Sequence, residues 1–368
     1  MSVVIREELR DVADYRPGRK PADVTVTAGA GEATDLVKLS SNELAFGPLP
    51  AAIQAMRAAV DEANRYPDFS ARGLVTALSS HLGVGEDQLA VDNGSAALCL
   101  SVVAAVTGPG DSVVMPWRSF PVYERAAQYR GAKPVRVPLT GGVKHDLPAM
   151  AEAITERTRV VFLCNPNNPT GAGIDATELR AFIDRVPGSV LVVVDEAYQD
   201  FVTNPAQRPH AVPLAAGREN VVVLRTFSKA FGLAGLRVGY AVGPARMTGA
   251  LRRLAAPFAV SGPAQAAAVA SLGALSEVQA RVAKVTAERA RLVAALRSRG
   301  MVVADSDANF VWLPLGQQSQ QFAASCERAG VLVRPFHPDG VRVTIGSSSD
   351  DDKFLGAVDQ WLGTRGSS

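Results

Sequence analysis

Three short apolar segments constrain the fold of this chain more than any other feature. Residues 160–163, 190–194 and 220–224 are apolar at every position except Asn220, and most of their residues are β-branched. Such runs are typical of parallel strands that are buried on both faces of a sheet. With 368 residues, of which 47% are hydrophobic, the chain can bury a large core. The sequence therefore predicts an α/β fold, with strands and helices alternating to about residue 255 and two lobes.

A lysine motif follows the third of these runs. Thr226, Ser228 and Lys229 lie where that strand would end, and Arg237 follows eight residues later. Ligands bind at the carboxyl ends of strands in open α/β sheets. Two hydroxyls and a guanidinium can hold a dianionic phosphate. A lysine whose pKa is lowered by desolvation can form a Schiff base with a carbonyl, although a Ser-Lys pair taken alone most often lies in a solvated loop.

Polar groups also follow the other two runs. Asp195 ends the second run, and a carboxylate at the end of a buried strand needs a cationic partner such as a protonated pyridine nitrogen. Tyr198 can donate a hydrogen bond to a phenolic oxygen on the pyridine ring that carries this nitrogen. Asn168, in the rigid turn at residues 164–171, can donate to the same oxygen. Strands also end in Asp for capping reasons, so this motif by itself leaves both interpretations open.

A further motif, residues 92–97, combines Gly94 and Ser95 before an apolar helix predicted over residues 98–106. The free amides at the start of a helix form an anion site. The motif therefore predicts a second group of phosphate contacts.

Together these motifs resemble the fold-type I pyridoxal-phosphate aminotransferases, and within them the histidinol-phosphate aminotransferase group. The resemblance runs from about Tyr15 to Ile345. It implies a mostly parallel central sheet in a large domain, a smaller α/β domain, and pyridoxal 5′-phosphate as cofactor. The implied division is residues 1–46 as an N-terminal arm and part of the small domain, residues 47–255 as the large cofactor-binding domain, and residues 256–368 as the C-terminal small domain.

The resemblance also implies roles for individual residues. Lys229 would carry the cofactor aldehyde, Asp195 would bind the pyridine nitrogen, and an aromatic ring would stack on the cofactor. The phenolic oxygen would be bound by Asn168 and Tyr198, the stacking ring would be Phe120, and the phosphate would be bound by Ser95, Ala96, Thr226, Ser228 and Arg237.

Substrate and subunit contacts follow from the same resemblance. Arg342 would bind the substrate α-carboxylate, Arg334 would handle the distal group, and Asn42 and Tyr15 would also contact the substrate. Tyr66 would reach the cofactor phosphate of a second subunit, which implies a homodimer. The alternatives are a surface salt bridge for either arginine and an ordinary buried tyrosine for Tyr66.

Departures from the histidinol-phosphate group bear on the substrate. Leu44, Phe46, Phe120 and the pair Ala96-Ala97 stand where that group usually has other residues, several of them polar. We expect them to make the pocket more apolar, which favours an aromatic side chain and resembles the actinobacterial phenylalanine aminotransferases. The predicted activity is ping-pong transamination between phenylalanine, tyrosine or tryptophan and 2-oxoglutarate, as in amino-acid biosynthesis.

The sequence leaves three other functions open. The first is a histidinol-phosphate aminotransferase, and the second is a related decarboxylase, since the cofactor contacts do not decide which Cα bond breaks. The third is a cofactor-binding regulatory domain of the kind fused to DNA-binding helices. The start at Met1 without a preceding helix-turn-helix and the presence of Arg342 count against the third.

Composition adds several exclusions. A formal net charge of +2 with dispersed basic residues predicts no nucleic-acid partner. The three cysteines and four histidines lack metal-ligand spacing, so no metal site is expected. Without a transmembrane stretch or a secretory signal, we expect a cytoplasmic protein with no membrane contact.

Overall fold

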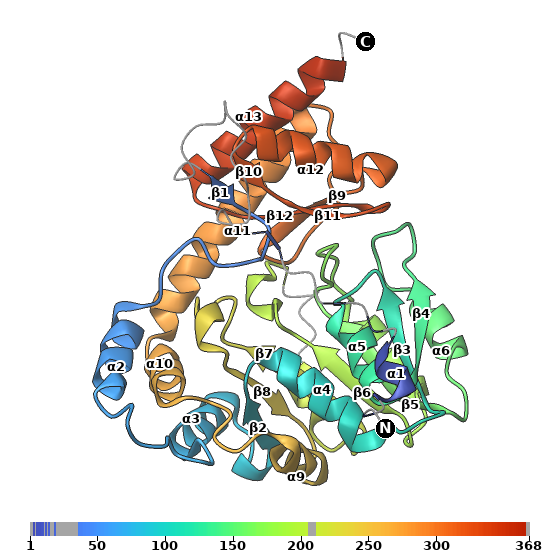
Figure 1. Ribbon diagram of the computed structural model, residues 1–368, viewed down its shortest axis with the longest axis vertical. Coiled ribbons are helices and arrows are strands. Elements are labelled where there is room, and N and C mark those ends of the chain that lie inside the picture. Colours follow the sequence, from blue (N-terminus) through green and yellow to red (C-terminus); the bar gives the residue numbers. More distant parts are fainter. Residues whose placement is uncertain are drawn as a thin grey trace.

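The computed structural model describes residues 3, 5–10, 12, 14, 18–19, 36–204 and 211–365. A seven-stranded sheet lies at the centre of the larger, lower lobe (Figure 1). Its strands, in spatial order, are β2 (Leu89–Asp92), β8 (Gly239–Val242), β7 (Val221–Thr226), β6 (Leu191–Asp195), β5 (Thr158–Cys164), β3 (Ser112–Trp117) and β4 (Lys133–Pro138). Only β8 pairs antiparallel with its neighbours, so the predicted mostly parallel sheet is confirmed.

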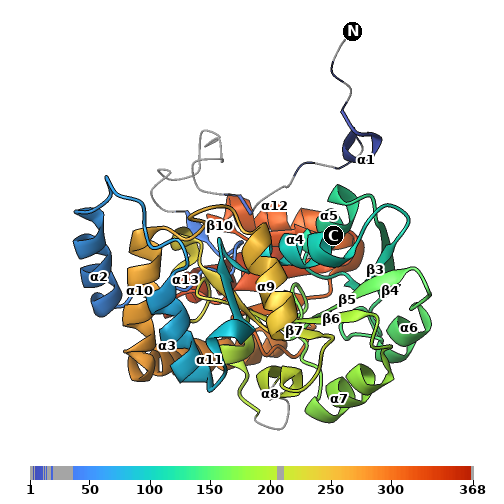
Figure 2. The same cartoon turned by 90° about the horizontal axis from the view of Figure 1, so that it is seen from below.

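Both faces of this sheet are covered by helices, as Figure 2 shows edge-on. One face packs against α4 (Ser95–Val106), α5 (Val122–Tyr129) and α9 (Ala245–Leu254), and the other against α6 (Leu147–Glu152), α7 (Ala176–Arg185) and α8 (Ala211–Ala215). Along β5, Val160 and Phe162 join the core under α4, whereas Val161 and Leu163 join the core over α7. Successive residues of a strand point to opposite faces, which explains why the run has no polar position.

The long helix α11 (Leu275–Ser298) connects the two lobes. Helix α10 (Gly262–Leu272) packs against α2 (Pro50–Val60) and α3 (Arg72–Leu82), and α11 continues from it into the upper lobe (Figure 1). Among the described residues, the remaining helical turns are α1 (Glu7–Arg10), η3 (Glu86–Gln88), η4 (Gln199–Phe201), η6 (Ala234–Leu236) and η7 (Gly316–Gln318). Within the described residues, no helix has the length and apolarity needed to cross a membrane.

The upper lobe contains two small sheets. Strands β11 (Arg334–Phe336), β12 (Gly340–Thr344) and β9 (Phe310–Leu313) form an antiparallel sheet, and β1 (Val37–Lys38) pairs parallel with β10 (Val331–Leu332). Helices α12 (Ser319–Arg328) and α13 (Ser348–Arg365) cover them. Residues 331–336, whose apolar pattern is that of a single strand, instead form two strands, because β10 and β11 belong to different sheets. Pro335 is tolerated in β11 because this is an edge strand.

Candidate active site

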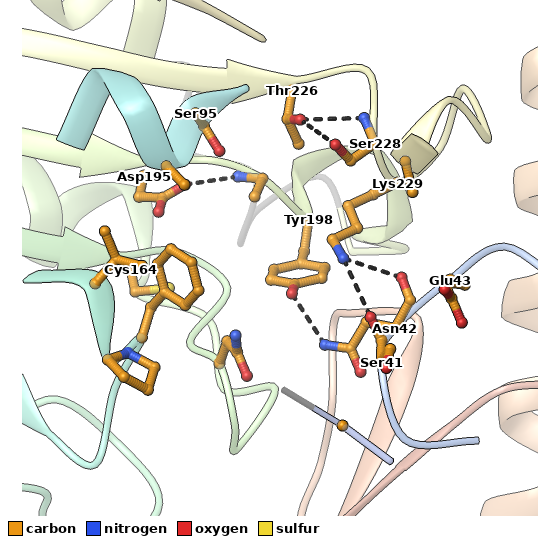
Figure 3. A pocket seen from close by; sticks show the side chains of 18 of the residues that line it. Ser41, Asn42, Glu43, Ser95, Cys164, Asp195, Tyr198, Thr226, Ser228 and Lys229 are labelled. Carbon is orange, nitrogen blue, oxygen red and sulfur yellow. Dashed lines mark hydrogen bonds between the residues drawn. The ribbon is translucent and has the colours of Figure 1, made fainter. Parts of the chain in front are cut away.

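A cavity of about 730 Å³ lies at the carboxyl ends of the parallel strands, and residues of the upper lobe line it as well (Figure 3). It brings together thirteen of the fifteen predicted site residues: Asn42, Ser95, Ala96, Phe120, Asn168, Asp195, Tyr198, Thr226, Ser228, Lys229, Arg237, Arg334 and Arg342. Adjacent parallel strands end at one edge, which is why motifs far apart in the sequence meet there.

Lys229 follows β7 and extends into this cavity (Figure 3). Its Nζ donates to the backbone carbonyl of Asn42 at 3.1 Å and to that of Ser41 at 3.5 Å. Desolvation, followed by the nearby cations Arg342 and Arg237, lowers the pKa of Lys229 to about 7. The lowered pKa favours the neutral amine, which is the form that attacks a carbonyl as a nucleophile.

A compact group of donors lies at the end of β7. Thr226 Oγ1 donates to Ser228 Oγ at 2.9 Å and accepts from the Ser228 amide at 3.1 Å. Arg237 Nη1 donates to Ser228 Oγ at 3.4 Å. These hydroxyls and the guanidinium lie where an anion can bind all of them.

Two glycines allow the start of α4 to join this group. A Cβ at Gly94 would lie 2.5 Å from Arg237 Nη2, and one at Gly239 would lie 2.5 Å from the Ser95 amide. The N-cap residue Gly94 has no side chain to cap the first amides of α4, so Ser95 and Ala96 present a helix N-terminus beside Arg237. Helix α4 begins at Ser95, three residues before the predicted start.

Asp195 ends β6 and is buried. Its Oδ2 accepts from Tyr123 Oη at 2.7 Å and its Oδ1 accepts from the Ala197 amide at 3.2 Å. Burial raises the pKa of Asp195, and these two hydrogen bonds oppose that rise. The sequence did not mark Tyr123 as a functional residue, because nothing in the motif around it shows that its hydroxyl meets a carboxylate.

Tyr198 and Asn168 approach the cavity from neighbouring loops. Tyr198 Oη accepts from Asn42 Nδ2 at 2.9 Å, and burial raises the pKa of this phenol. Asn168 Oδ1 accepts from Arg342 Nη1 at 2.5 Å, so the amide NH₂ of Asn168 is the group that can donate to a ligand. Asn42 therefore contributes to the site through Tyr198 and Lys229 as well as by lining the cavity.

Arg342 and Arg334 face each other across the β11–β12 pair. Arg342 is only 7% exposed and donates from Nη2 to the Ser40 carbonyl at 2.8 Å, so the surface salt bridge is ruled out for it. The guanidinium carbons of Arg342 and Arg334 lie 5.5 and 5.8 Å from the Phe336 ring centroid. The cavity thus has two cations beside an aromatic side chain.

Two predicted site residues are not in the cavity. Tyr66 is 81% exposed and stacks on Phe258 with a centroid distance of 4.5 Å, so it is not the ordinary buried tyrosine considered above. Tyr15 lies outside the described residues. The expectation that Leu44 and Phe46 line the pocket is wrong, because they pack against the main core and Leu44 reaches Gly232 instead.

The residues present fit a phosphorylated pyridine aldehyde. The cavity is lined by a group of anion-binding donors, a buried carboxylate and a lysine of lowered pKa. It is also lined by Asn168 and Tyr198, which can donate hydrogen bonds to the phenolic oxygen of such a ring. The close approach of Arg237 to Gly94, which a Cβ would block, supports the phosphate position in particular. Fold and site together define a fold-type I pyridoxal-phosphate enzyme.

Comparisons with known proteins give the family. The model of aminotransferase class I and II matches residues 34–358. The aromatic amino acid aminotransferase of Streptomyces avermitilis is 49% identical over 97% of both chains, and that of Rhodococcus jostii is 48% identical over 95% of this chain and 94% of its own. The chain belongs to the class I and II aminotransferases, and its cofactor is pyridoxal 5′-phosphate.

Solved structures agree on the fold. The histidinol-phosphate aminotransferase of Sinorhizobium meliloti, solved in complex with pyridoxal 5′-phosphate, superposes with a TM-score of 0.84. It is 27% identical, and the match covers 89% of this chain and 91% of that one.

Proposed function

We propose that this enzyme transfers the amino group between an aromatic amino acid and 2-oxoglutarate. The observation that carries the proposal is the identity of 48–49% over nearly the whole chain to aminotransferases named for aromatic amino acids. The cavity supports it, because four apolar residues, Leu100, Phe120, Val122 and Phe336 (the apolar wall), line it together with Arg334 and Arg342. Phenylalanine is the expected preferred substrate, with tyrosine and tryptophan also accepted.

Pyridoxal phosphate, when bound, supplies an aldehyde that takes the amino group and a ring that accepts electrons from Cα. Lys229 Nζ then takes the proton from the substrate Cα, a task suited to an amine of pKa about 7. Asp195 binds the protonated ring nitrogen, and Asn168 and Tyr198 bind the phenolic oxygen. Thr226, Ser228 and Arg237, together with the start of α4, hold the phosphate.

Substrate orientation falls to the two arginines. Arg342 is anchored by Asn168 and Ser40 and binds the α-carboxylate through its planar fork. Arg334, on the facing strand, binds the distal carboxylate of 2-oxoglutarate. One site therefore serves both halves of a ping-pong reaction, with the apolar wall used in one half and Arg334 in the other.

Initial velocities test this assignment. With phenylalanine and 2-oxoglutarate varied together, double-reciprocal plots should be parallel, and phenylpyruvate and glutamate should form in equal amounts. Histidinol phosphate should give a much lower kcat/KM than phenylalanine. A higher kcat/KM for histidinol phosphate would favour the histidine-synthesis alternative, and release of CO₂ with an amine product would favour the decarboxylase.

We also propose that the active enzyme is a homodimer in which Tyr66 serves the partner's site. Tyr66 and Phe69 are largely exposed, and both rings contact Phe258, so aromatic side chains gather at one surface. Exposed aromatic groups are typical of protein interfaces. Within its own chain, Tyr66 does not line the cavity.

Mixed subunits test the dimer. A Lys229→Ala subunit paired with a Tyr66→Ala subunit would form one complete site, built from Lys229 of one copy and Tyr66 of the other. We expect the mixture, after subunit exchange, to be more active than either variant alone and to sediment as a dimer. A monomeric enzyme, or a mixture with no recovered activity, would refute the arrangement.

A further inference from the structure

Among the described residues, Tyr123 donates the shorter of the two hydrogen bonds that the Asp195 carboxylate accepts. Its Oη donates to Asp195 Oδ2 at 2.7 Å, and its side chain is fully buried. The ring of Tyr123 stacks on Phe162 of β5 with a centroid distance of 4.2 Å and an interplanar angle of 9°. Helix α5 and strand β5 therefore fix the position of this hydroxyl together.

Tyr123 also contacts a second group at the cavity wall. The ring of Phe120 meets the ring of Tyr123 edge to face, at 5.6 Å and 85°. Phe120 lines the cavity, whereas Tyr123 does not. One buried residue thus contacts both the carboxylate that is assigned to the ring nitrogen of the cofactor and the aromatic ring that is assigned to stack on the cofactor.

The surroundings of Asp195 make this hydrogen bond important. The other titratable groups that face the carboxylate are Cys99, Cys164, Tyr198 and Lys229, and of these only Lys229 favours its charge. Burial raises the pKa of Asp195, and the Tyr123 hydrogen bond is the largest effect that lowers it. Without the hydroxyl, the carboxylate would keep only the Ala197 amide as a hydrogen-bond donor among the described contacts.

We propose that Tyr123 is a positioning residue that orients the Asp195 carboxylate and keeps it charged for the ring nitrogen of the cofactor. The inference rests on the proposed function, because it assigns Asp195 to the ring nitrogen. Tyr123 acts only through Asp195 and Phe120, so it does not itself touch the cofactor or the substrate.

Cofactor binding to the apoenzyme tests this role without measuring activity. The two probes are pyridoxal phosphate and its analogue with CH in place of the ring nitrogen, and their affinities are measured by titration of tryptophan fluorescence. In Tyr123→Phe, we expect pyridoxal phosphate to bind roughly tenfold more weakly, the typical effect of losing a hydrogen bond to a charged group. The analogue, which offers Asp195 no ring nitrogen, should change by less than about twofold.

A matched control removes another buried tyrosine hydroxyl. Tyr240 lies on β8, is buried and does not line the cavity, so Tyr240→Phe should leave the ratio of the two affinities unchanged. Equal weakening of both ligands in Tyr123→Phe would reduce Tyr123 to a structural role. An unchanged affinity of Tyr123→Phe for pyridoxal phosphate would show that Tyr123 has no role in cofactor binding.

A second variant covers the case in which Tyr123→Phe does not fold. Phe162→Leu retains the hydroxyl but removes the stacked ring that fixes it. We expect the same selective loss of pyridoxal phosphate affinity, with a smaller magnitude, and a loss shared with the analogue would contradict the inference. If neither ligand bound the wild-type enzyme, the proposed function itself would fail, which is a different result from a failure of Tyr123.

Discussion

The side-chain amide of Asn42 donates a hydrogen bond to Tyr198 Oη at 2.9 Å, and the Asn42 carbonyl accepts from Lys229 Nζ at 3.1 Å. The same residue is tied to the upper lobe, because its amide N donates to Thr344 Oγ1 and its carbonyl accepts from Asn309 Nδ2. Asn42 therefore connects Tyr198 and Lys229 with the upper lobe, which carries Arg334 and Arg342.

Replacing Asn42 tests this connection. Asn42 has a backbone φ of 54°, a conformation that Asn and Gly tolerate better than Ala. Asn42→Ala should lower the free energy of unfolding by about 1–3 kcal/mol and reduce kcat. Asn42→Gly should recover part of the stability in urea unfolding but none of the kcat. Full activity in Asn42→Gly would show that the side-chain amide is dispensable.

The lowered pKa of Lys229 predicts a pH-dependent stability for the apoenzyme. The pKa falls from 10.5 to about 7 on folding, so unfolding takes up a proton between these values and stability rises with pH across that window. Lys229→Met removes the buried amine. Urea midpoints should show the variant to be more stable than wild type at pH 7, with a gap that closes toward pH 10. A stability difference between Lys229→Met and wild type that does not depend on pH would contradict the lowered pKa of Lys229.

A buried ion pair joins the ends of β6 and β7. Glu196 Oε2 accepts from Arg225 Nε at 2.9 Å and from Nη2 at 2.7 Å, and the Glu196 side chain is fully buried. Glu196→Gln leaves Arg225 without its counterion and should lower the unfolding free energy by about 3–5 kcal/mol. The double variant Glu196→Leu/Arg225→Met should recover most of this loss in urea. A double variant as unstable as Glu196→Gln would show that the ion pair itself is stabilising.

Asp351 provides a test in the upper lobe. Burial, together with neighbouring Glu288, raises the pKa of Asp351 from 3.8 to about 8. A raised carboxyl pKa gives stability that is complete below the unfolded value and lost as pH rises through the folded value. Asp351→Asn should therefore gain stability over wild type progressively between pH 4 and 8. Exposed Asp352, which pairs with Arg291 at 2.8 Å, is the control, and Asp352→Asn should change stability by less than about 1 kcal/mol at any pH.

Much of the site could be predicted because it follows from local patterns. The apolar runs specify β5, β6 and β7, and the motifs directly after them must meet at one sheet edge, which places Asn168, Asp195 and Lys229 together. Gly94 and Ser95, which form the start of α4, likewise indicated a helix N-terminus at the same edge. For these residues, the residue type and the position relative to the end of a strand were enough to predict a shared site.

Contacts made between distant segments could not be predicted. Tyr123 and Asp195 are 72 residues apart, and Asn42 and Tyr198 are 156 apart, so their hydrogen bonds exist only through tertiary packing. The prediction that Leu44 lines the pocket was wrong for the same reason. The position of the Leu44 side chain depends on how the segment around it packs against Gly232. The domain boundaries at residues 46 and 255 stay a prediction, as does the role of Tyr66 across a dimer.

The most direct measurement mixes the cofactor-loaded enzyme with phenylalanine alone and follows the visible absorbance of the bound cofactor in a single turnover. We expect complete loss of this absorbance, formation of one equivalent of phenylpyruvate per site, and recovery of the absorbance when 2-oxoglutarate is added. Lys229→Ala should show no such cycle. An enzyme whose absorbance responds to histidinol phosphate at far lower concentration than to phenylalanine would contradict the aromatic assignment.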